Sequence, residues 1–259
     1  MGCVSVTEEQ NTEQTTENVP IIDLNTPKQV LKAPPKIENS DKQQSLDQTP
    51  QAKPRIKVQE VQKIPEPVAP IDIWQRLRQG FEITPNKLPH SADLQLQRYL
   101  KNPHNLNLLF EHSAPYLFHV TEQLENANLP LELALLPIVE SNYDPLAYSP
   151  SHAIGLWQFI PATATSLGLE RSRWYEGRRD VVHSTTAAVT YLGYLNKQFN
   201  GNWLHALAAY NSGEGVVRKA IRKNRRLGKS TEFWFLRLPR ETKNYVPQLM
   251  ALASVVNQA

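Results

Sequence analysis

Residues 130–145 read PLELALLPIVESNYDP and decide how the centre of the chain folds. Pro130 suits the first position of a helix, because that position needs no N–H donor. The apolar run Leu133–Val139 has no polar side, which is typical of a helix buried on all faces. Pro137 predicts a kink inside this run, and Pro145 predicts its end, because the residue before a proline disfavours helical backbone. Glu140 is therefore expected in the last turn of a buried helix.

Glu140 is a carboxylic acid at the end of this apolar run. Burial disfavours its charged form, and the negative end of the helix dipole does the same, so both raise its pKa. A general acid needs a raised pKa to hold its proton near neutral pH. The alternative is a glutamate that pairs with an arginine or lies just beyond the core, since buried carboxylates are usually paired. The helix alone leaves both interpretations open.

The chain from Ile71 onward predicts helices and no strands, because apolar residues recur at helical spacing. The residues expected to face a core in the first part are Trp74, Leu77, Phe81, Leu94, Leu96, Tyr99, Leu100, Leu108, Leu109, Tyr116, Leu117, Val120 and Leu124. Further helices are expected from Pro161 to Gly168, from about Ser184 to Phe199, from Asn202 through Tyr210, over Glu214–Arg225, and over Glu241–Asn257 with a kink at Pro247. The predicted fold class is mainly α.

The first 70 residues are polar, contain several prolines and have no aromatic residue. Such a segment cannot bury enough apolar area to offset chain entropy, so we predict a disordered tether over residues 1–71. A helical lead-in over 72–126 and a catalytic domain over 127–259 complete the expected organisation. The formal charge of +3 arises from the part after residue 71. That part is therefore mildly basic, which suits a polyanionic partner.

Cys3 is the only cysteine, which excludes a disulfide within the chain. No run of about 18 apolar residues predicts a membrane-spanning helix, and no basic start followed by an apolar stretch indicates a signal peptide. Gly2-Cys3 looks like the end of a bacterial lipoprotein signal. We therefore expect that the sequence begins too late and that Cys3 carries a lipid. The alternative is an ordinary free cysteine; myristoylation fits worse, because Val6 stands where Ser or Thr is wanted.

Four blocks of sequence include or follow Glu140: IVESNYDP at 138–145 with YSP at 148–150, AIGLWQFIPAT at 153–163, AAYNSG at 208–213, and PRETKNYVP at 239–247. In this order and spacing they resemble the lytic murein transglycosylases with the soluble-lytic-transglycosylase (SLT) domain, over roughly residues 72–257. The helical lead-in, WYEGRRD at 174–180 and the segment 204–210 look closest to the membrane-bound D type. That type commonly carries C-terminal LysM modules, and none precedes Ala259, so anchoring by such modules stays open.

The resemblance implies a goose-lysozyme-like helical fold with a cleft for a glycan strand. It implies that Glu140 is the sole catalytic acid/base, and that Tyr210 faces it. The residues expected to bind substrate are Ser149, Gln158, Tyr210, Asn211 and Glu241. Trp157 stands where relatives often place methionine, which predicts a larger wall at that subsite.

Plain structural alternatives exist for three of these residues. Ser149 precedes a proline and would serve as a turn residue. Tyr210 would be a core aromatic with a satisfied hydroxyl, and Glu241 a helix-terminal charge that complements the dipole. Asp144 is interpreted as a turn residue before Pro145, not as a second catalytic carboxylate.

The resemblance implies a peptidoglycan lytic transglycosylase that cleaves the bond from N-acetylmuramic acid (MurNAc) to N-acetylglucosamine (GlcNAc) and leaves 1,6-anhydro ends. Alternatives are a lysozyme-like hydrolase and a non-catalytic peptidoglycan-binding protein. The expected location is the periplasm of a Gram-negative bacterium, attached to the outer membrane through Cys3.

No metal or cofactor is expected, because His152, His183 and His205 lack metal-ligand spacing. Nor is nucleic acid an expected partner. The basic residues Lys219, Arg222, Lys223, Arg225, Arg226 and Lys229 are interpreted as a solvated face, or as a surface that attracts the carboxylates of peptidoglycan stem peptides.

Overall fold

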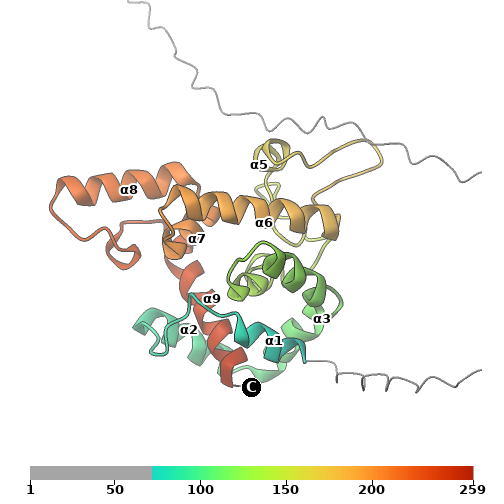
Figure 1. Cartoon of the computed structure of the whole chain (residues 1–259), viewed down its shortest axis with the longest axis horizontal. Helices are drawn as coiled ribbons and strands as arrows, with labels where there is room; N and C mark the ends of the chain where they lie inside the picture. The colour runs from blue at the N-terminus through green and yellow to red at the C-terminus, as the bar shows by residue number, and fades with distance from the viewer. Residues whose placement is uncertain (1–71, 259) are drawn as a thin grey trace, which may run out of the picture. The chain divides into compact units, whose positions relative to one another are not determined.

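The computed structural model describes residues 72–258, and over this range it is helical (Figure 1). The α-helices are α1 (Ile73–Gln79), α2 (His90–Leu100), α3 (Pro103–Asn126), α4 (Leu136–Ser141), α5 (Pro161–Ser166), α6 (Val181–Gln198), α7 (Trp203–Ser212), α8 (Glu214–Arg226) and α9 (Arg240–Gln258); two 3₁₀ helices are η1 (Leu131–Leu135) and η2 (Phe233–Phe235). Pairing of β type within 72–258 is limited to isolated bridges. The expected mainly α fold is confirmed.

Two expectations concern residues outside the described part of the chain. The tether over 1–71 and the lipid on Cys3 both lie there. Among the helices of residues 72–258, none has the length and apolarity needed to cross a bilayer.

The central segment, η1 followed directly by α4, is buried along most of its length. All residues from Leu131 to Ile138 are buried, including Glu132, and α3 and α9 pack against η1. Pro137 occupies the first turn of α4, so the expected kink appears as the change from 3₁₀ to α geometry. The burial predicted from the apolar run is confirmed, and it leaves Glu140 at the solvent end of the segment.

The end of α4 is sharper than the sequence predicts. The helix stops at Ser141, because Asn142 and Tyr143 adopt left-handed backbone with φ of 54° and 61°. The Tyr143 hydroxyl donates to the carbonyl of Ala134 at 2.7 Å, and this buried bond holds the reversed chain against η1. Asp144 then forms the expected turn by accepting from the amide of Leu146 at 2.8 Å.

The later helices have the predicted positions within a few residues. Asn202 caps α7 by accepting from the amide of His205 at 3.0 Å, and Gly201 before it has a φ of +81°. Pro161 opens α5, and Pro247 lies inside α9. Capping and proline chemistry thus set these boundaries as the sequence indicates.

The lead-in helices pack onto the same hydrophobic core as the rest of residues 72–258. Figure 1 shows α2 beside α9, and the two helices are in contact. The prediction that Leu94, Leu100 and Leu108 face this core is wrong, since their side chains are 48%, 47% and 36% exposed. In α2 the inward face is Ala92 and Leu96, spaced one turn apart, and Leu94 lies off that stripe.

Glu132 is a fully buried carboxylate that organises the loop after α1. Its Oε1 accepts from the amides of Ile83 at 2.7 Å and Thr84 at 2.9 Å. Its Oε2 accepts from the amide of Glu82 at 3.0 Å. Three backbone donors thus compensate the buried charge, as burial of a carboxylate requires.

We predict that Glu132→Ala lowers the free energy of unfolding by about 3 kcal/mol, because three buried amides lose a charged acceptor. Urea unfolding followed by circular dichroism measures the change. The matched control is Glu111→Ala, an exposed glutamate on α3, which should change stability by less than about 0.5 kcal/mol. Equal stability of the two variants would contradict the assignment.

Candidate active site

Glu140 ends the central segment, and its carboxyl group meets a tyrosine from the last helix. The Tyr245 hydroxyl in α9 donates to Glu140 Oε1 at 2.5 Å, across 105 residues of sequence. Tyr245 is 4% exposed and Glu140 is partly buried. This bond fixes the carboxyl group between α4 and α9.

The surroundings of Glu140 favour its protonated form. The pKa of Glu140 is raised to about 7 as the net result of three effects: burial raises it most, the hydrogen bond from Tyr245 lowers it, and the charge of Glu241 raises it. Desolvation is therefore the main cause, as the apolar run predicts. A carboxyl group with this pKa exchanges its proton near neutral pH, which is the property of a general acid/base.

Ser141, the neighbour of Glu140, fixes the end of α4. Its hydroxyl lies 2.9 Å from the carbonyl of Leu156 and 3.2 Å from that of Pro137. The first contact joins α4 to the segment 153–159. Ser141 therefore holds the backbone that carries Glu140.

Tyr210 of α7 lies close enough to Glu140 for their charges to interact. Burial, and then the charge of Glu140, raise the pKa of Tyr210 well above its usual value. Its hydroxyl donates to the carbonyl of Trp157 at 2.8 Å, so the described hydrogen bond to Glu140 comes from Tyr245 instead. Tyr210 is therefore compatible with both interpretations. It is a core aromatic residue with a satisfied hydroxyl, and it also lies near the carboxyl group of Glu140.

The expectation that Trp157 forms a wall of a subsite is wrong. Its side chain is fully buried, and its indole N–H donates to Thr185 Oγ1 of α6 at 3.1 Å. The indole is amphipathic, and its one donor has found a partner inside the core. Trp157 contributes to the site through its backbone carbonyl, which positions Tyr210.

Asn211 and Glu241 join the end of α7 to the start of α9. Asn211 Nδ2 donates to Glu241 Oε1 at 3.0 Å, and Asn211 Oδ1 accepts from the Thr242 hydroxyl at 2.7 Å. Glu241 is exposed, and Thr242 is buried. Because Tyr245 lies one helical turn beyond Glu241, this junction also sets the position of the Tyr245 hydroxyl.

Ser149 and Gln158 lie on the irregular segment between α4 and α5. Ser149 Oγ accepts from the amide of Ala153 at 3.0 Å and contacts Ser151 Oγ. The Gln158 side chain donates to the carbonyl of Gly155 at 2.9 Å. Both residues are partly exposed. Within residues 72–258, their hydrogen bonds are to this segment and not to Glu140.

Gly155 is required where this segment turns. Its φ is +82°, and a Cβ there would lie 1.9 Å from the carbonyl oxygen of Arg178. Any side chain would therefore push residues 178–179 away. Gly155 lets the segment that carries Ser149 and Gln158 pack directly on the block around Arg178.

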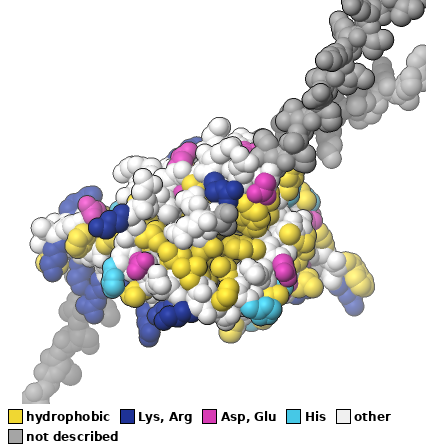
Figure 2. Space-filling model, turned by 90° about the horizontal axis from the view of Figure 1, so that it is seen from below, with side chains coloured by type: hydrophobic (Ala, Val, Ile, Leu, Met, Phe, Trp, Pro, Cys, Tyr) yellow, Lys and Arg dark blue, Asp and Glu magenta, His cyan; other side chains and the backbone are white. Residues whose placement is uncertain are grey.

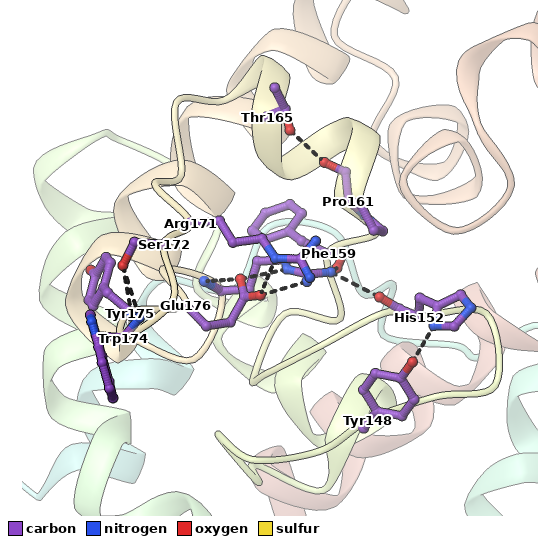
Figure 3. A network of polar contacts seen from close by, with 11 residues as sticks. Tyr148, His152, Phe159, Pro161, Thr165, Arg171, Ser172, Trp174, Tyr175 and Glu176 are labelled. Atoms are coloured by element: carbon purple, nitrogen blue, oxygen red, sulfur yellow. Dashed lines mark hydrogen bonds and ion pairs between the residues drawn. The ribbon is translucent and has the colours of Figure 1, made fainter.

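Arg178 is a buried cation that holds two loops together, and Figure 3 labels its partners His152, Phe159 and Glu176. It is 3% exposed and pairs with Glu176, whose Oε2 lies 2.8 Å from its Nη2. Its Nη1 donates to the carbonyls of His152 at 2.9 Å and Phe159 at 3.1 Å. Glu176 also contacts Arg171, and these arginines hold its pKa below the usual value. The site segment 148–159 is thus anchored to the loop 171–176.

The basic cluster of α8 and the turn after it lies on the surface. Its members Lys219, Arg222, Lys223, Arg225, Arg226 and Lys229 are all exposed. Figure 2 shows Lys and Arg side chains gathered over the end of the molecule where α8 lies. A solvated face is the description that fits these residues. In residues 72–258, no three His, Cys, Asp or Glu residues are grouped so that they could hold a metal ion.

Tyr245 and Ser141 are the site residues that sequence reasoning missed. Tyr245 belongs to the block 239–247 and stands four residues after Glu241, which puts both on one face of a helix. That spacing was the available signal. The contact with Glu140 itself depends on how α9 packs, which no local pattern specifies.

We predict that Glu140→Gln stabilises the fold more at pH 8 than at pH 4. The folded pKa of about 7 exceeds the unfolded value of 4.5. The stability linked to this proton is therefore complete below pH 4.5 and is lost as the pH rises through 7. Glutamine never carries the charge that becomes costly above that pH. Urea unfolding at both pH values measures the difference; Glu111→Gln, an exposed control, should show none. A gain at pH 8 no larger than at pH 4 would contradict the raised pKa.

Comparisons with known proteins show what this chain is similar to. Residues 120–233 match the family model "Transglycosylase SLT domain". The chain is 50% identical over 165 residues to membrane-bound lytic murein transglycosylase D of Escherichia coli K12, covering 64% of this chain and 36% of the relative. The chain thus spans about a third of the length of that relative.

Two further similarities are lower. Membrane-bound lytic murein transglycosylase F of Desulfosudis oleivorans is 34% identical over 101 residues, which cover 37% of this chain and 21% of the relative. A solved structure of an inactive variant of the lytic transglycosylase Slt from Pseudomonas aeruginosa is 26% identical, with a TM-score of 0.45 over 54% of this chain and 23% of the other. Residues 120–233 thus match the transglycosylase SLT domain, and the chain is similar to a membrane-bound lytic murein transglycosylase of the D type.

Proposed function

We propose that the protein is a peptidoglycan lytic transglycosylase with Glu140 as its catalytic acid/base. The observation that carries the proposal is the carboxyl group of Glu140, which burial gives a pKa of about 7 and which Tyr245 holds in place. It lies within the matched SLT domain. The relative's name supports murein as the substrate of this chain as well.

The proposed reaction uses one carboxyl group for two proton transfers. Protonated Glu140 donates to the oxygen that joins MurNAc to GlcNAc, and the glycosidic bond breaks. The 2-acetamido group of the substrate stabilises the cationic centre, as in substrate-assisted glycosidases. The Glu140 carboxylate then accepts the proton of the MurNAc C6 hydroxyl, whose oxygen closes the 1,6-anhydro ring. Water is not consumed, and Glu140 is protonated again.

The charges around Glu140 support a mechanism with a single catalytic carboxyl group. Asp144 is exposed, and its carboxylate accepts from the amide of Leu146. Glu241 raises the pKa of Glu140 through its charge, but its own carboxylate is exposed and bound to Asn211. We propose that Glu241 adds to the effect of burial in keeping Glu140 protonated and that it does not act as a nucleophile.

Substrate binding is proposed for Ser149, Gln158, Tyr210 and Asn211. Ser149 and Gln158 lie on a segment that Arg178 anchors, and both are partly exposed. Tyr210 stands near Glu140, where its dipole would stabilise charge on the acetamido group. Asn211 supports the position of α9 through Thr242.

A location in the Gram-negative cell envelope is proposed from the membrane-bound relatives. Attachment to the outer membrane through a lipid on Cys3 belongs to the same proposal. The matching experiment is metabolic labelling of the parent and Cys3→Ala proteins with radioactive palmitate.

Product analysis tests the reaction. Mass spectrometry of digested glycan strands should show 1,6-anhydro ends, each one water lighter than a reducing end. Reducing ends alone would instead identify the lysozyme-like hydrolase. We expect Glu140→Gln to lower turnover by at least about 10³-fold, because it removes the only proton donor, while binding to strands persists. Cleavage by this variant at the parent rate would refute the catalytic assignment.

The pH dependence tests the role of Tyr245. Cleavage that requires protonated Glu140 should fall as the pH rises through about 7. Because the Tyr245 hydroxyl stabilises the charged form, Tyr245→Phe should raise the pKa of Glu140 and move this falling limb of kcat/KM to higher pH. Tyr194→Phe, an exposed tyrosine on α6, is the control and should leave the profile unchanged. A Tyr245→Phe limb that stays in place or moves to lower pH would contradict the assignment.

A further inference from the structure

Trp174 stands out because its side chain is 88% exposed, more than any other large apolar side chain among residues 72–258. A single exposed apolar residue is common and has no meaning by itself. Trp174, however, lies at the tip of a loop in which the adjacent residues are held by hydrogen bonds. Figure 3 shows its ring pointing away from the contacts of Glu176, on the opposite side from Tyr148 and His152.

The loop that carries Trp174 is held by specific bonds. Ser172 Oγ accepts from the amides of Trp174 at 3.2 Å and Tyr175 at 3.0 Å. The amide of Ser172 donates to the carbonyl of Tyr175 at 2.8 Å. The Tyr175 hydroxyl donates to Asp180 Oδ2 at 3.0 Å. The indole ring is therefore presented to solvent by an ordered turn, and its exposure costs little further entropy on binding.

Beside the ring is a surface depression of about 430 Å³. Its lining residues are Ser172, Arg173, Trp174, Tyr175, Glu176, Arg179 and Asp180. Two aromatic side chains thus lie among five polar or charged ones in this depression.

The charges in the depression favour an anionic ligand. Glu176 is neutralised by Arg178 and Arg171. Asp180 stays negatively charged, because hydrogen bonds from the amide of His183 and from Tyr175 hold its pKa at about 2. The arginines in and beside the depression still outnumber these two carboxylates. Arg173 lies over the Trp174 ring with its Cζ 5.4 Å from the ring centre, and neither Arg173 nor Arg179 forms an ion pair within residues 72–258. Two exposed guanidinium groups thus flank an exposed indole.

We propose that this depression is an accessory binding site for a sugar ring with a carboxylate-bearing substituent. The flat C–H face of a pyranose packs on an indole and removes apolar surface from water. The guanidinium groups of Arg173 and Arg179 bind the carboxylate. If the proposed function holds, the ligand is a MurNAc unit of the same glycan strand, away from the bond that Glu140 cleaves. The carboxylate then belongs to the stem peptide or to a free lactyl group.

The buried pair Arg178–Glu176 connects this accessory site to the candidate active site. Glu176 lines the depression, and Arg178 binds the carbonyls of His152 and Phe159 on the segment that carries Ser149 and Gln158. A strand bound at Trp174 therefore rests on a loop that is rigidly joined to the proposed substrate-binding segment. Its role is to retain long strands, since short oligosaccharides would fill only the active site.

Binding measurements on the full chain test the proposal. All variants carry Glu140→Gln so that strands are not cut, and retention on purified sacculi and calorimetric affinity for soluble strands are measured. Trp174→Ala should weaken binding roughly five- to tenfold, as loss of an aromatic contact does. Trp174→Phe should recover part of it. Phe235→Ala is the matched control, because Phe235 is also exposed, at 63%, but lies on η2. Parent-like binding by Trp174→Ala, or an equal loss in the control, would overturn the proposal.

Three ligands identify the source of the charge. The affinities of the parent and of the Arg173→Gln/Arg179→Gln variant are measured for each ligand. The three ligands are peptide-bearing strands, strands stripped of peptides, and chitin oligomers, which lack carboxylates. A loss confined to peptide-bearing strands assigns the carboxylate to the stem peptide, and a loss confined to stripped strands assigns it to the free lactyl group. A loss with both shows that either carboxylate binds, and an equal loss with chitin oligomers would overturn the anionic part. The same affinity of parent and variant for every ligand would overturn the anionic part.

Activity separates this proposal from the proposed function. With Glu140 intact, Trp174→Ala should keep its turnover of short soluble oligosaccharides and show a higher KM for long strands. If the parent produces anhydro ends but Trp174→Ala binds like the parent, the accessory site is wrong and the function stands. If the parent cleaves nothing while Trp174→Ala loses binding, the function is wrong and the site stands.

Discussion

The burial of residues 131–138 is the constraint on which the described structure depends. The segment must turn from 3₁₀ to α geometry at Pro137 and end abruptly at Asn142, so Glu140 reaches the solvent boundary attached to a buried helix. Water only partly solvates its carboxyl group, and the pKa rises as a direct result. The same packing that stabilises the core therefore makes the proposed acid. A fold of this kind accepts a cost in stability at high pH in exchange for a proton that is available near neutrality.

Two connections keep the surroundings of Glu140 in place, and they have different physical character. Asn211, Thr242 and Glu241 join α7 to α9 through neutral and charge-assisted hydrogen bonds. Arg178 joins two irregular loops through a buried ion pair and two backbone carbonyls. Irregular segments lack the repeating bonds of helices, so a buried guanidinium with several donors can replace them. The mainly helical protein thus uses a charged residue where no helix is available.

Local chemistry explains why much of the fold was predictable. Asn202 acts through a side-chain cap three residues away, and Gly201, Pro161 and Pro247 act through their own backbone geometry. Their helices lie where the sequence places them. The prediction for Leu94, Leu100 and Leu108 is wrong because helical spacing alone does not specify which side of each helix faces the core.

The site was predictable only in part. The position of Glu140 and the reason for its raised pKa follow from one run of sequence. The sequence predicts Trp157 as the wall of a subsite, although its indole bonds to Thr185 in the core, and it gives no role to Tyr245. Both depend on contacts between segments far apart in sequence, 28 residues for Trp157 and 105 for Tyr245. Periodicity carries no information about such pairs.

The long separation between Glu140 and Tyr245 has a consequence for synthesis. The ribosome adds Glu140 to the chain about 100 residues before it reaches α9. At typical rates of protein synthesis this interval lasts roughly 5–20 s. During that time the central segment has neither the phenol that holds its carboxyl group nor the Glu241 charge that favours its proton. The newly made chain therefore lacks a complete acid/base until its last described helix has packed. The packing of α9 therefore completes both the described fold and the surroundings of Glu140. The acid/base is complete only after synthesis of this region has finished.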